Sequence, residues 1–259
     1  MTSWRDWWRR DDGLNDRPRA DVGDDVRVYA IGDLHGRLDL METLLDRIAQ
    51  DGRARGSMQT TILFLGDLVD RGPNSRRIVE RMIDMMATGD EVRCLKGNHE
   101  ELFVLVARGE VRAVPTFRKA GGAQTLSSYG LPPLDFERMA DRAVADWALN
   151  NVSRSHVDFL DALPDTFETG DYLFVHAGIR PGVKIAEQRG EDLRWIRHDF
   201  LDHQGAHPRM IVHGHSITED VDIRDNRIGI DTGAFMTGRL TAIGIQGTAR
   251  WFLQTDPTA

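Results

Sequence analysis

The sequence has almost no cysteine, the residue that crosslinks secreted proteins. It also lacks the long apolar runs of a membrane-spanning protein. Cys94 is the single cysteine among 259 residues, which excludes an intramolecular disulfide and favours a reducing compartment. The longest apolar run, residues 102–107, is far shorter than the roughly 20 residues that cross a bilayer. The first ten residues also lack the apolar stretch of a signal peptide. We therefore predict a cytoplasmic protein without a transmembrane segment.

An excess of basic charge is also missing. Lys and Arg number 33 against 41 Asp and Glu, so the formal net charge is −8. Proteins that bind nucleic acid regardless of sequence neutralise phosphates with clustered Lys and Arg, which this balance opposes. Hydrophobic residues at 41% and charged residues at 29% are typical of a folded domain. We expect a folded protein with no nucleic-acid partner, and make no prediction of its oligomeric state.

The N-terminal residues differ in character from the rest. Trp4, Trp7 and Trp8 fall at helical spacing beside several arginines, and a polar stretch over 11–25 follows. Such an aromatic face could touch a membrane surface or a partner, or pack on its own domain. The polar stretch favours a loosely ordered arm. We predict an arm over 1–20 and one domain over 21–259.

Three strand–loop–helix units follow one another along the chain. Apolar runs at 27–31, 61–65 and 92–95 predict buried strands, and apolar stripes at 38–48, 79–86 and 100–108 predict the helices after them. Glu100 is interpreted only as a charge that suits the dipole of the third helix. This β-α-β-α-β order predicts a parallel sheet with ligands at the carboxyl ends of its strands.

Residues 112–162 interrupt this pattern and are predicted to form a helical cap insertion, with helices near 138–149 and 153–160. Short apolar runs then return at 172–175, 210–212, 227–230, 240–245 and 250–253. Their short connections indicate that some of them pair antiparallel. Two mixed sheets stacked face to face would accommodate all of these strands.

Side chains that bind metal ions follow five of the predicted strands. In chain order they are Asp33 and His35, Asp67 and Asp70, Asn98 and His99, His176, and His213 and His215. Each group alone is an ordinary turn sequence, but their joint occurrence after strands indicates one site. The mixture of oxygen and nitrogen donors suits manganese, iron or zinc better than calcium. The number of donors fits two ions better than one, with manganese as the first choice.

The same motifs resemble a known family. They are Gly32-Asp33-Leu34-His35-Gly36, Gly66-Asp67-Leu68-Val69-Asp70-Arg71-Gly72, Gly97-Asn98-His99-Glu100, Val175-His176-Ala177-Gly178 and Val212-His213-Gly214-His215. This set is similar to the metallophosphoesterases, specifically the calcineurin-like phosphoprotein phosphatases. Residues 121–125, 192–197 and 230–240 are most similar to the bacterial and bacteriophage serine/threonine phosphatase branch. The resemblance implies an αββα sandwich.

The resemblance also implies which residues hold the ions. By it, Asp33 and His35 hold the first ion, Asp67 bridges the two ions, and Asn98, His176 and His215 hold the second. His213 and His215 are taken to share a strand face, so either could be the ligand, and the family pattern favours His215.

Five residues are assigned roles in the reaction. Arg71 and Arg197 have guanidinium groups that suit the oxygens of a phosphoryl group, and with Asn98 they are expected to bind the substrate. By resemblance, His99 protonates the leaving alkoxide and Asp70 orients its imidazole. Arg194 stands where the family pattern has an apolar residue, and is expected to face solvent.

We predict a metal-dependent phosphomonoesterase that removes phosphate from phosphoserine or phosphothreonine in a protein substrate, by direct attack of a metal-bridging hydroxide. One alternative is a symmetrical bis(5'-nucleosyl)-tetraphosphatase, which has the same metal loops and a different cap. Another is a non-catalytic module that binds phosphoproteins.

Overall fold

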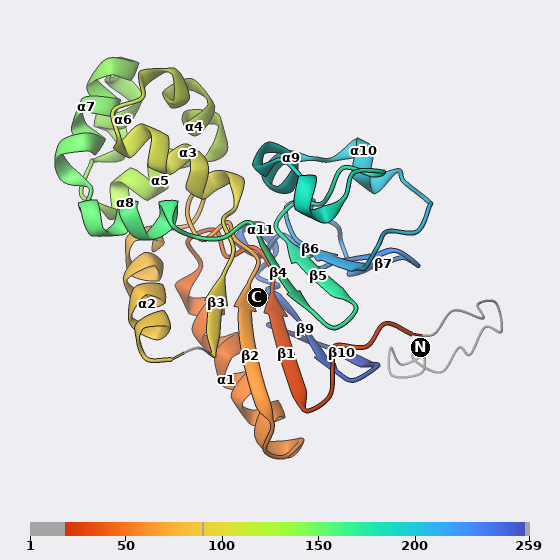
Figure 1. Cartoon of the computed structure of the whole chain (residues 1–259). Helices are drawn as coiled ribbons and strands as arrows, with labels where there is room; N and C mark the ends of the chain where they lie inside the picture. The colour runs from red at the N-terminus through yellow and green to blue at the C-terminus, as the bar shows by residue number, and fades with distance from the viewer. Residues whose placement is uncertain (1–18, 90, 257–259) are drawn as a thin grey trace.

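Two five-stranded mixed sheets lie face to face in the computed structural model, which describes residues 19–89 and 91–256 (Figure 1). The first sheet has the order β10-β9-β1-β2-β3, with β1 Val26–Ile31, β2 Gln59–Phe64, β3 Val92–Cys94, β9 Thr241–Gln246 and β10 Ala249–Gln254. The second has the order β4-β5-β6-β8-β7, with β4 Thr166–Thr169, β5 Tyr172–Val175, β6 Met210–His213, β7 Asp222–Ile223 and β8 Arg227–Gly229.

Helices cover the outer faces of both sheets. The helices near the first sheet are α1 Leu38–Ala54, α2 Ser75–Ala87 and α3 Asn98–Ala107. The cap contains η2 Val111–Ala113, α4 Val114–Ala120, α5 Gly122–Ser128, α6 Pro133–Arg138, α7 Asp141–Asn151 and α8 Arg154–Asp161. The later helices are η3 Ile185–Glu187, α9 Gly190–Trp195, α10 His198–Leu201 and α11 Ala234–Thr237. In Figure 1 the cap helices form a compact group at one end of the first sheet.

Strand alternation sends side chains into two different cores. In β1, Val28 and Ala30 point between the sheets, where they pack with Phe174 of β5 and Val212 of β6. The intervening Tyr29 and Ile31 point to the other side and pack against α1. Leu173 of the second sheet packs outward in the same way, against α9 and α10. The result is the predicted αββα sandwich.

Six strands end at the same side of the sandwich. β1, β2 and β3 are parallel neighbours in the first sheet, and β5, β6 and β8 are parallel neighbours in the second. β9 and β10 pair antiparallel beside β1, and β4 and β7 are antiparallel edge strands of the second sheet. The loops after the six parallel strands can therefore meet. Ligand sites of such sheets lie at this position, beyond the carboxyl ends of the strands.

The eight strands expected from the sequence all occur in the described residues, with ends that differ by at most two residues. β4 and β7 were missed because they are short edge strands without an apolar alternation. The third helix, expected over 100–108, begins two residues earlier, because α3 starts at Asn98. The cap helices lie within the predicted insertion, but the short helices α4–α6 and α9–α11 were not expected.

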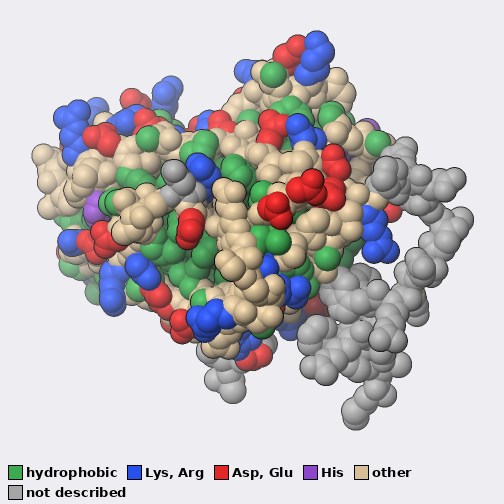
Figure 2. All heavy atoms as spheres, turned by 60° about the horizontal axis from the view of Figure 1, so that its bottom comes forward, with side chains coloured by type: hydrophobic (Ala, Val, Ile, Leu, Met, Phe, Trp, Pro, Cys, Tyr) green, Lys and Arg blue, Asp and Glu red, His purple; other side chains and the backbone are tan. Residues whose placement is uncertain are grey.

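The predicted N-terminal arm lies outside the described residues up to residue 18. Its last part contacts the second sheet, since the hydroxyl of Tyr172 donates to the carbonyl of Ala20 at 3.3 Å. The face of the molecule in Figure 2 mixes Lys and Arg with Asp and Glu and carries no continuous basic surface. Within the described part of the chain, no helix is long and apolar enough to cross a bilayer.

Candidate metal centre and active site

The loops after the six parallel strands carry unusual backbone conformations. Six non-glycine residues of the described chain have positive φ, and five belong to these loops: His35, Asp67, Asp70, Arg71 and His215. Such conformations each cost about 1 kcal/mol or more and persist only where neighbouring contacts fix them. The loops are therefore held in place by specific interactions.

The loops after β1 and β2 are fixed to each other through their backbones. The backbone N–H groups of Leu34 and His35 donate to the carbonyl of Asp67 at 3.1 and 2.8 Å. Gly36 and Gly72 approach so closely that a Cβ on Gly36 would lie 2.4 Å from the carbonyl oxygen of Gly72. Only glycine allows this approach.

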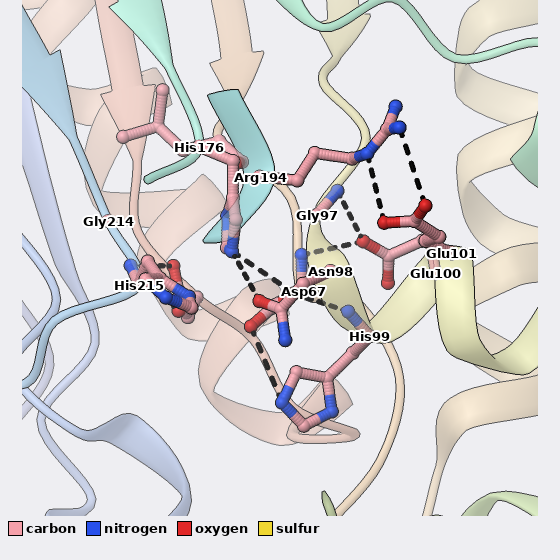
Figure 3. A network of polar contacts seen from close by, with 12 residues as sticks. Asp67, Gly97, Asn98, His99, Glu100, Glu101, His176, Arg194, Gly214 and His215 are labelled. Atoms are coloured by element: carbon pink, nitrogen blue, oxygen red, sulfur yellow. Dashed lines mark hydrogen bonds and ion pairs between the residues drawn. The ribbon is translucent and has the colours of Figure 1, made fainter. Parts of the chain in front are cut away.

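Glu100 holds the loop after β2 against the loop after β3. Its buried carboxylate accepts hydrogen bonds from the backbone N–H of Gly97 at 2.9 Å, Asp67 at 2.8 Å and Leu68 at 2.8 Å (Figure 3). Burial, followed by the charge of Asp67, raises the pKa of Glu100 to about 7. The bond to Gly97 also caps α3, which explains why the helix begins at Asn98. From the sequence, Glu100 was assigned only a helix-dipole role, because its partners Asp67 and Leu68 lie over 30 residues away in the chain.

Asp67 lies between two groups of potential metal ligands. One ligand atom from each of His35, Asp67 and His99 lies within 4.8 Å of the others, and the same holds for Asp67, His176 and His215. Oδ2 of Asp67 is 3.6 Å from Nε2 of His35, and Oδ1 is 3.3 Å from Nε2 of His176. The two oxygens of one carboxylate thus face different histidines, which is the arrangement that a bridging ligand needs.

The tautomers of His35 and His176 are set by backbone carbonyls. Nδ1 of His35 donates to the carbonyl of Val69 and Nδ1 of His176 to that of Leu65, both at 2.9 Å. Burial lowers the pKa of both imidazoles, so both are neutral near pH 7. In each ring the lone pair of Nε2 then faces the site, as metal-binding histidines require.

The second group brings several acceptors together, and the backbone N–H of His99, which donates to Oδ1 of Asp67 at 3.1 Å, satisfies only part of them. Nε2 of His176 lies 3.0 Å from Oδ1 of Asn98 and 3.3 Å from Oδ1 of Asp67. Nε2 of His215 is buried and has no hydrogen-bond partner. Converging lone pairs in a buried site are unfavourable unless a cation neutralises them. The donor set therefore fits a divalent ion, with the nitrogen and oxygen ligands that manganese, iron or zinc accept.

Asp33 lies beside these groups but belongs to neither. Its two carboxylate oxygens accept the backbone N–H of His215 at 3.3 and 3.1 Å. Its buried neighbour is the carboxyl of Asp231, which follows β8 and was assigned no role from the sequence. Burial, then the charges of Asp231 and Asp67, raises the pKa of Asp33 well above its usual value. A cation near Asp33 would relieve this crowding of carboxyl groups.

The expectation that His213 and His215 share a strand face is wrong. His213 is the last residue of β6, whereas His215 follows the strand with φ of 63°. This left-handed conformation places the ring of His215 against that of His176, with centroids 5.0 Å apart. The ring of His213 instead packs edge-on against Phe200, outside both ligand groups.

His99, a member of the first ligand group, forms a buried pair with Asp70. Nδ1 of His99 lies 2.6 Å from Oδ2 of Asp70. The hydroxyl of Thr125 in cap helix α5 donates to Oδ1 of Asp70 at 2.6 Å and accepts the Asp70 backbone N–H at 2.8 Å. Burial would lower the pKa of His99, but the charge of Asp67 and the hydrogen bond to Asp70 outweigh it and raise that pKa to about 9. A raised pKa favours the imidazolium, which is the form of His99 that can donate a proton.

The two predicted guanidinium groups lie at the edges of the site. Nη2 of Arg71 is 3.4 Å from Nε2 of His99, and its Cζ lies 4.5 Å from the ring centroid of Phe235. Arg197 is exposed, and its Nη1 donates to the hydroxyl of Ser216 at 3.4 Å. Phe235 was part of a matched motif but had no role assigned from the sequence.

Arg194 was expected to face solvent, and this expectation is wrong. Its guanidinium donates to Glu101 of α3 at 3.1 Å and to Asp165 at 2.7 Å, and its side chain is only 17% exposed (Figure 3). The indole N–H of the neighbouring Trp195 also donates to Glu101, at 2.7 Å. These bonds join α9, which precedes Arg197, to the helix that carries His99.

Nitrogen and oxygen ligands on both sides of one carboxylate, with guanidinium groups at the edges, define a metal-dependent phosphoesterase. Residues 26–234 match the calcineurin-like phosphoesterase family, and the chain belongs to that family. The symmetrical bis(5'-nucleosyl)-tetraphosphatase of Ralstonia nicotianae is 29% identical over 227 residues, which cover 84% of this chain and 64% of that protein. The asymmetrical bis(5'-nucleosyl)-tetraphosphatase PrpE of Bacillus velezensis is 28% identical, with coverage of 82% and 86%.

Solved structures show the same fold. A provisionally assigned diadenosine tetraphosphatase superposes with a TM-score of 0.60 at 20% identity, covering 91% of this chain and 98% of that one. A serine/threonine phosphatase from Saccharomyces cerevisiae superposes with a TM-score of 0.51 at 13% identity, covering 91% and 81%. This chain thus has the family fold and spans just under two thirds of the Ralstonia protein.

We expect His215→Ala to lose one of two bound manganese ions, because the buried Nε2 of His215 belongs to the second ligand group and has no hydrogen-bond partner. His213→Ala, the matched control, keeps both ions, because its ring packs against Phe200. Metal content after dialysis, measured by mass spectrometry, checks this. If only His213→Ala lost an ion, His213 would be the metal ligand and His215 would not.

Glu100→Gln replaces one acceptor oxygen with an amide donor that faces backbone N–H groups. We expect a destabilisation of about 2–3 kcal/mol, together with weaker manganese binding. Urea unfolding and calorimetric titration with manganese measure the two effects. The control Glu101→Gln alters a partly exposed ion pair and is expected to cost below about 1 kcal/mol. Equal effects of both variants would contradict the role given to Glu100.

Proposed function

We propose that this metallophosphoesterase hydrolyses dinucleoside tetraphosphates. The observation that carries the proposal is the position of Asp67 between two ligand groups, with Arg71 and Arg197 at the edges of the same site. The Ralstonia and Bacillus relatives, named as bis(5'-nucleosyl)-tetraphosphatases, support the dinucleotide over a phosphoprotein. The serine/threonine phosphatase expected from the sequence becomes the second candidate.

The metal site of this proposal contains two divalent ions. Asp33 and His35 would hold the first, Asn98, His176 and His215 the second, and Asp67 both. Manganese is the first choice, with iron or zinc also suited to these donors. When bound, the ions would polarise the phosphoryl oxygens and lower the pKa of a water molecule in the site.

The remaining polar groups of the site act on the phosphate. Arg71 and Arg197 offer guanidinium groups whose N–H donors match phosphoryl oxygens, and Asn98 offers an amide. Arg71 already contacts Phe235 and His99, so its charge would stabilise the transition state at little reorganisation cost. An acidic protein can thus attract a polyanion locally.

His99 is assigned as the acid that protonates the leaving group. Its bond to Asp70 fixes the ring, and the hydroxyl of Thr125 fixes Asp70 in turn. A metal ligand must be neutral, whereas the raised pKa of His99 favours the imidazolium. This acid favours the second candidate, because the alkoxide released from phosphoserine or phosphothreonine needs a proton more than ADP does.

The decisive experiment compares two substrates on the manganese-loaded protein. We expect kcat/KM for diadenosine tetraphosphate to exceed that for a phosphothreonine peptide at least tenfold. Chromatography of the products distinguishes symmetrical cleavage, which gives two ADP, from asymmetrical cleavage, which gives ATP and AMP. A preference for the peptide would establish the second candidate, and binding without turnover of either substrate would indicate the non-catalytic module.

His99→Asn is expected to lower kcat for the phosphothreonine peptide about 100-fold or more, since general acids contribute about 10²–10⁴. The loss for diadenosine tetraphosphate should be smaller, because ADP leaves as a stable anion. A general acid works below its own pKa, so the wild-type kcat falls as pH rises through that value, and the variant lacks this fall. Metal content of the variant is the control. Loss of an ion would make His99 a ligand instead.

The location and partner of the protein form part of the same proposal. We infer a cytoplasmic enzyme without a nucleic-acid partner, in which residues 21–259 form the catalytic domain. A phosphorylated protein substrate belongs to the second candidate only.

A further inference from the structure

An exposed apolar surface lies next to the site. Met236 is 67% exposed and Ile217 is 43% exposed. Together with the half-buried Phe235 they form what we call the apolar ledge. The other large exposed hydrophobic residues of the described chain, Leu134 and Leu149, lie in the cap. Exposed apolar side chains grouped beside polar ones often mark a binding surface.

The ledge joins the two ends of the site. The ring of Phe235 lies 5.4 Å from that of His35 and contacts the guanidinium of Arg71. Ile217 follows Ser216, whose hydroxyl accepts a hydrogen bond from Arg197. A Cβ on Gly233 would lie 3.1 Å from Ile217 and 3.4 Å from Met236, so both side chains lie against that glycine. The apolar surface therefore runs between the two positive charges.

The ledge is also held rigidly. Arg37 donates to the carbonyl of Ala234 at 3.1 Å, and the hydroxyl of Thr237 donates to that of Thr232 at 2.9 Å. The backbone N–H of Gly233 donates to Oδ1 of Asp231 at 2.9 Å, which ties the ledge to the neighbour of Asp33. A surface fixed in this way is preorganised for a ligand.

We propose that the apolar ledge binds the purine base of a nucleotide whose phosphates occupy the metal site. This rests on the proposed function and specifies how the substrate is recognised. A purine offers a flat face that packs on Met and Phe side chains, and its phosphate chain is anionic, which suits guanidinium groups on either side.

An apolar side chain of a phosphopeptide fits the ledge less well. An extended peptide is usually held by free backbone groups as well as by pockets. The backbone N–H groups of Met236, Thr237 and Gly238 already donate within α11, and that of Arg239 donates to the hydroxyl of Thr237. The ledge thus offers side-chain surface and few main-chain partners, which favours a base over a peptide.

The test compares two ligands that differ only by adenosine. They are adenosine 5'-(α,β-methylene)diphosphate and methylenediphosphonate, both resistant to hydrolysis. Their Kd values are measured by calorimetry on the manganese-loaded full chain. For Ile217→Ser/Met236→Ser we expect Kd for the adenosine ligand to rise about tenfold relative to Kd for methylenediphosphonate. Met236→Leu, which keeps an apolar surface, should restore most of the affinity when Ile217 is present.

The matched control is Leu134→Ser/Leu149→Ser, which removes two equally exposed apolar side chains from the cap and should change neither Kd. The proposal is overturned if the ledge variant weakens both ligands equally, or neither, or if it weakens only a phosphothreonine peptide. The measurement needs no turnover. A failure of the proposed function would therefore appear in the substrate comparison alone, and a failure of the ledge in calorimetry alone.

Discussion

The hydrogen bonds of one buried carboxylate hold the site together. Glu100 accepts the backbone N–H groups of Gly97, Asp67 and Leu68, and so joins the loops that follow two neighbouring strands. The cap on α3, the position of Asn98 and the left-handed conformation of Asp67 all depend on this contact. A buried carboxylate is costly unless it is fully hydrogen-bonded, and here the metal loops supply those bonds.

The buried carboxyl groups of the site have too few positive charges among their neighbours. Asp33, Asp67 and Asp231 lie close together in buried positions, and neutral histidines turn their lone pairs toward them. Cations are the physical solution to such a cluster. The fold thus makes an acidic protein into a receptor for divalent ions, and through them for phosphates.

The cap and the segment after β8 adapt this common centre to a substrate. The cap fixes Asp70 through Thr125, and Arg71 donates its backbone N–H to Gly121 at 3.1 Å. The segment after β8 supplies Phe235 beneath Arg71 and the exposed side chain of Met236. The family motifs therefore lie in the strand-end loops, whereas Thr125, Phe235 and Met236 belong to the segments around them. This explains why the same motifs fit both an expected phosphoprotein phosphatase and relatives named as tetraphosphatases.

The sequence alone determined the main strands, two stacked sheets and the set of candidate ligands, because apolar periodicity and residues directly after strands are local signals. The αββα sandwich followed from the family resemblance. The sequence also assigned Asp33, His35, Asp67, Asn98 and His176 to one edge of the sheets, and the structure places them there. The family pattern favoured His215 over His213, and the tertiary structure supplies the physical reason, since the left-handed backbone of His215 after β6 turns its ring against that of His176. Only the tertiary structure decided the partners of Glu100, Asp231 and Arg194, because these hydrogen bonds and charge contacts join residues that are distant in the chain.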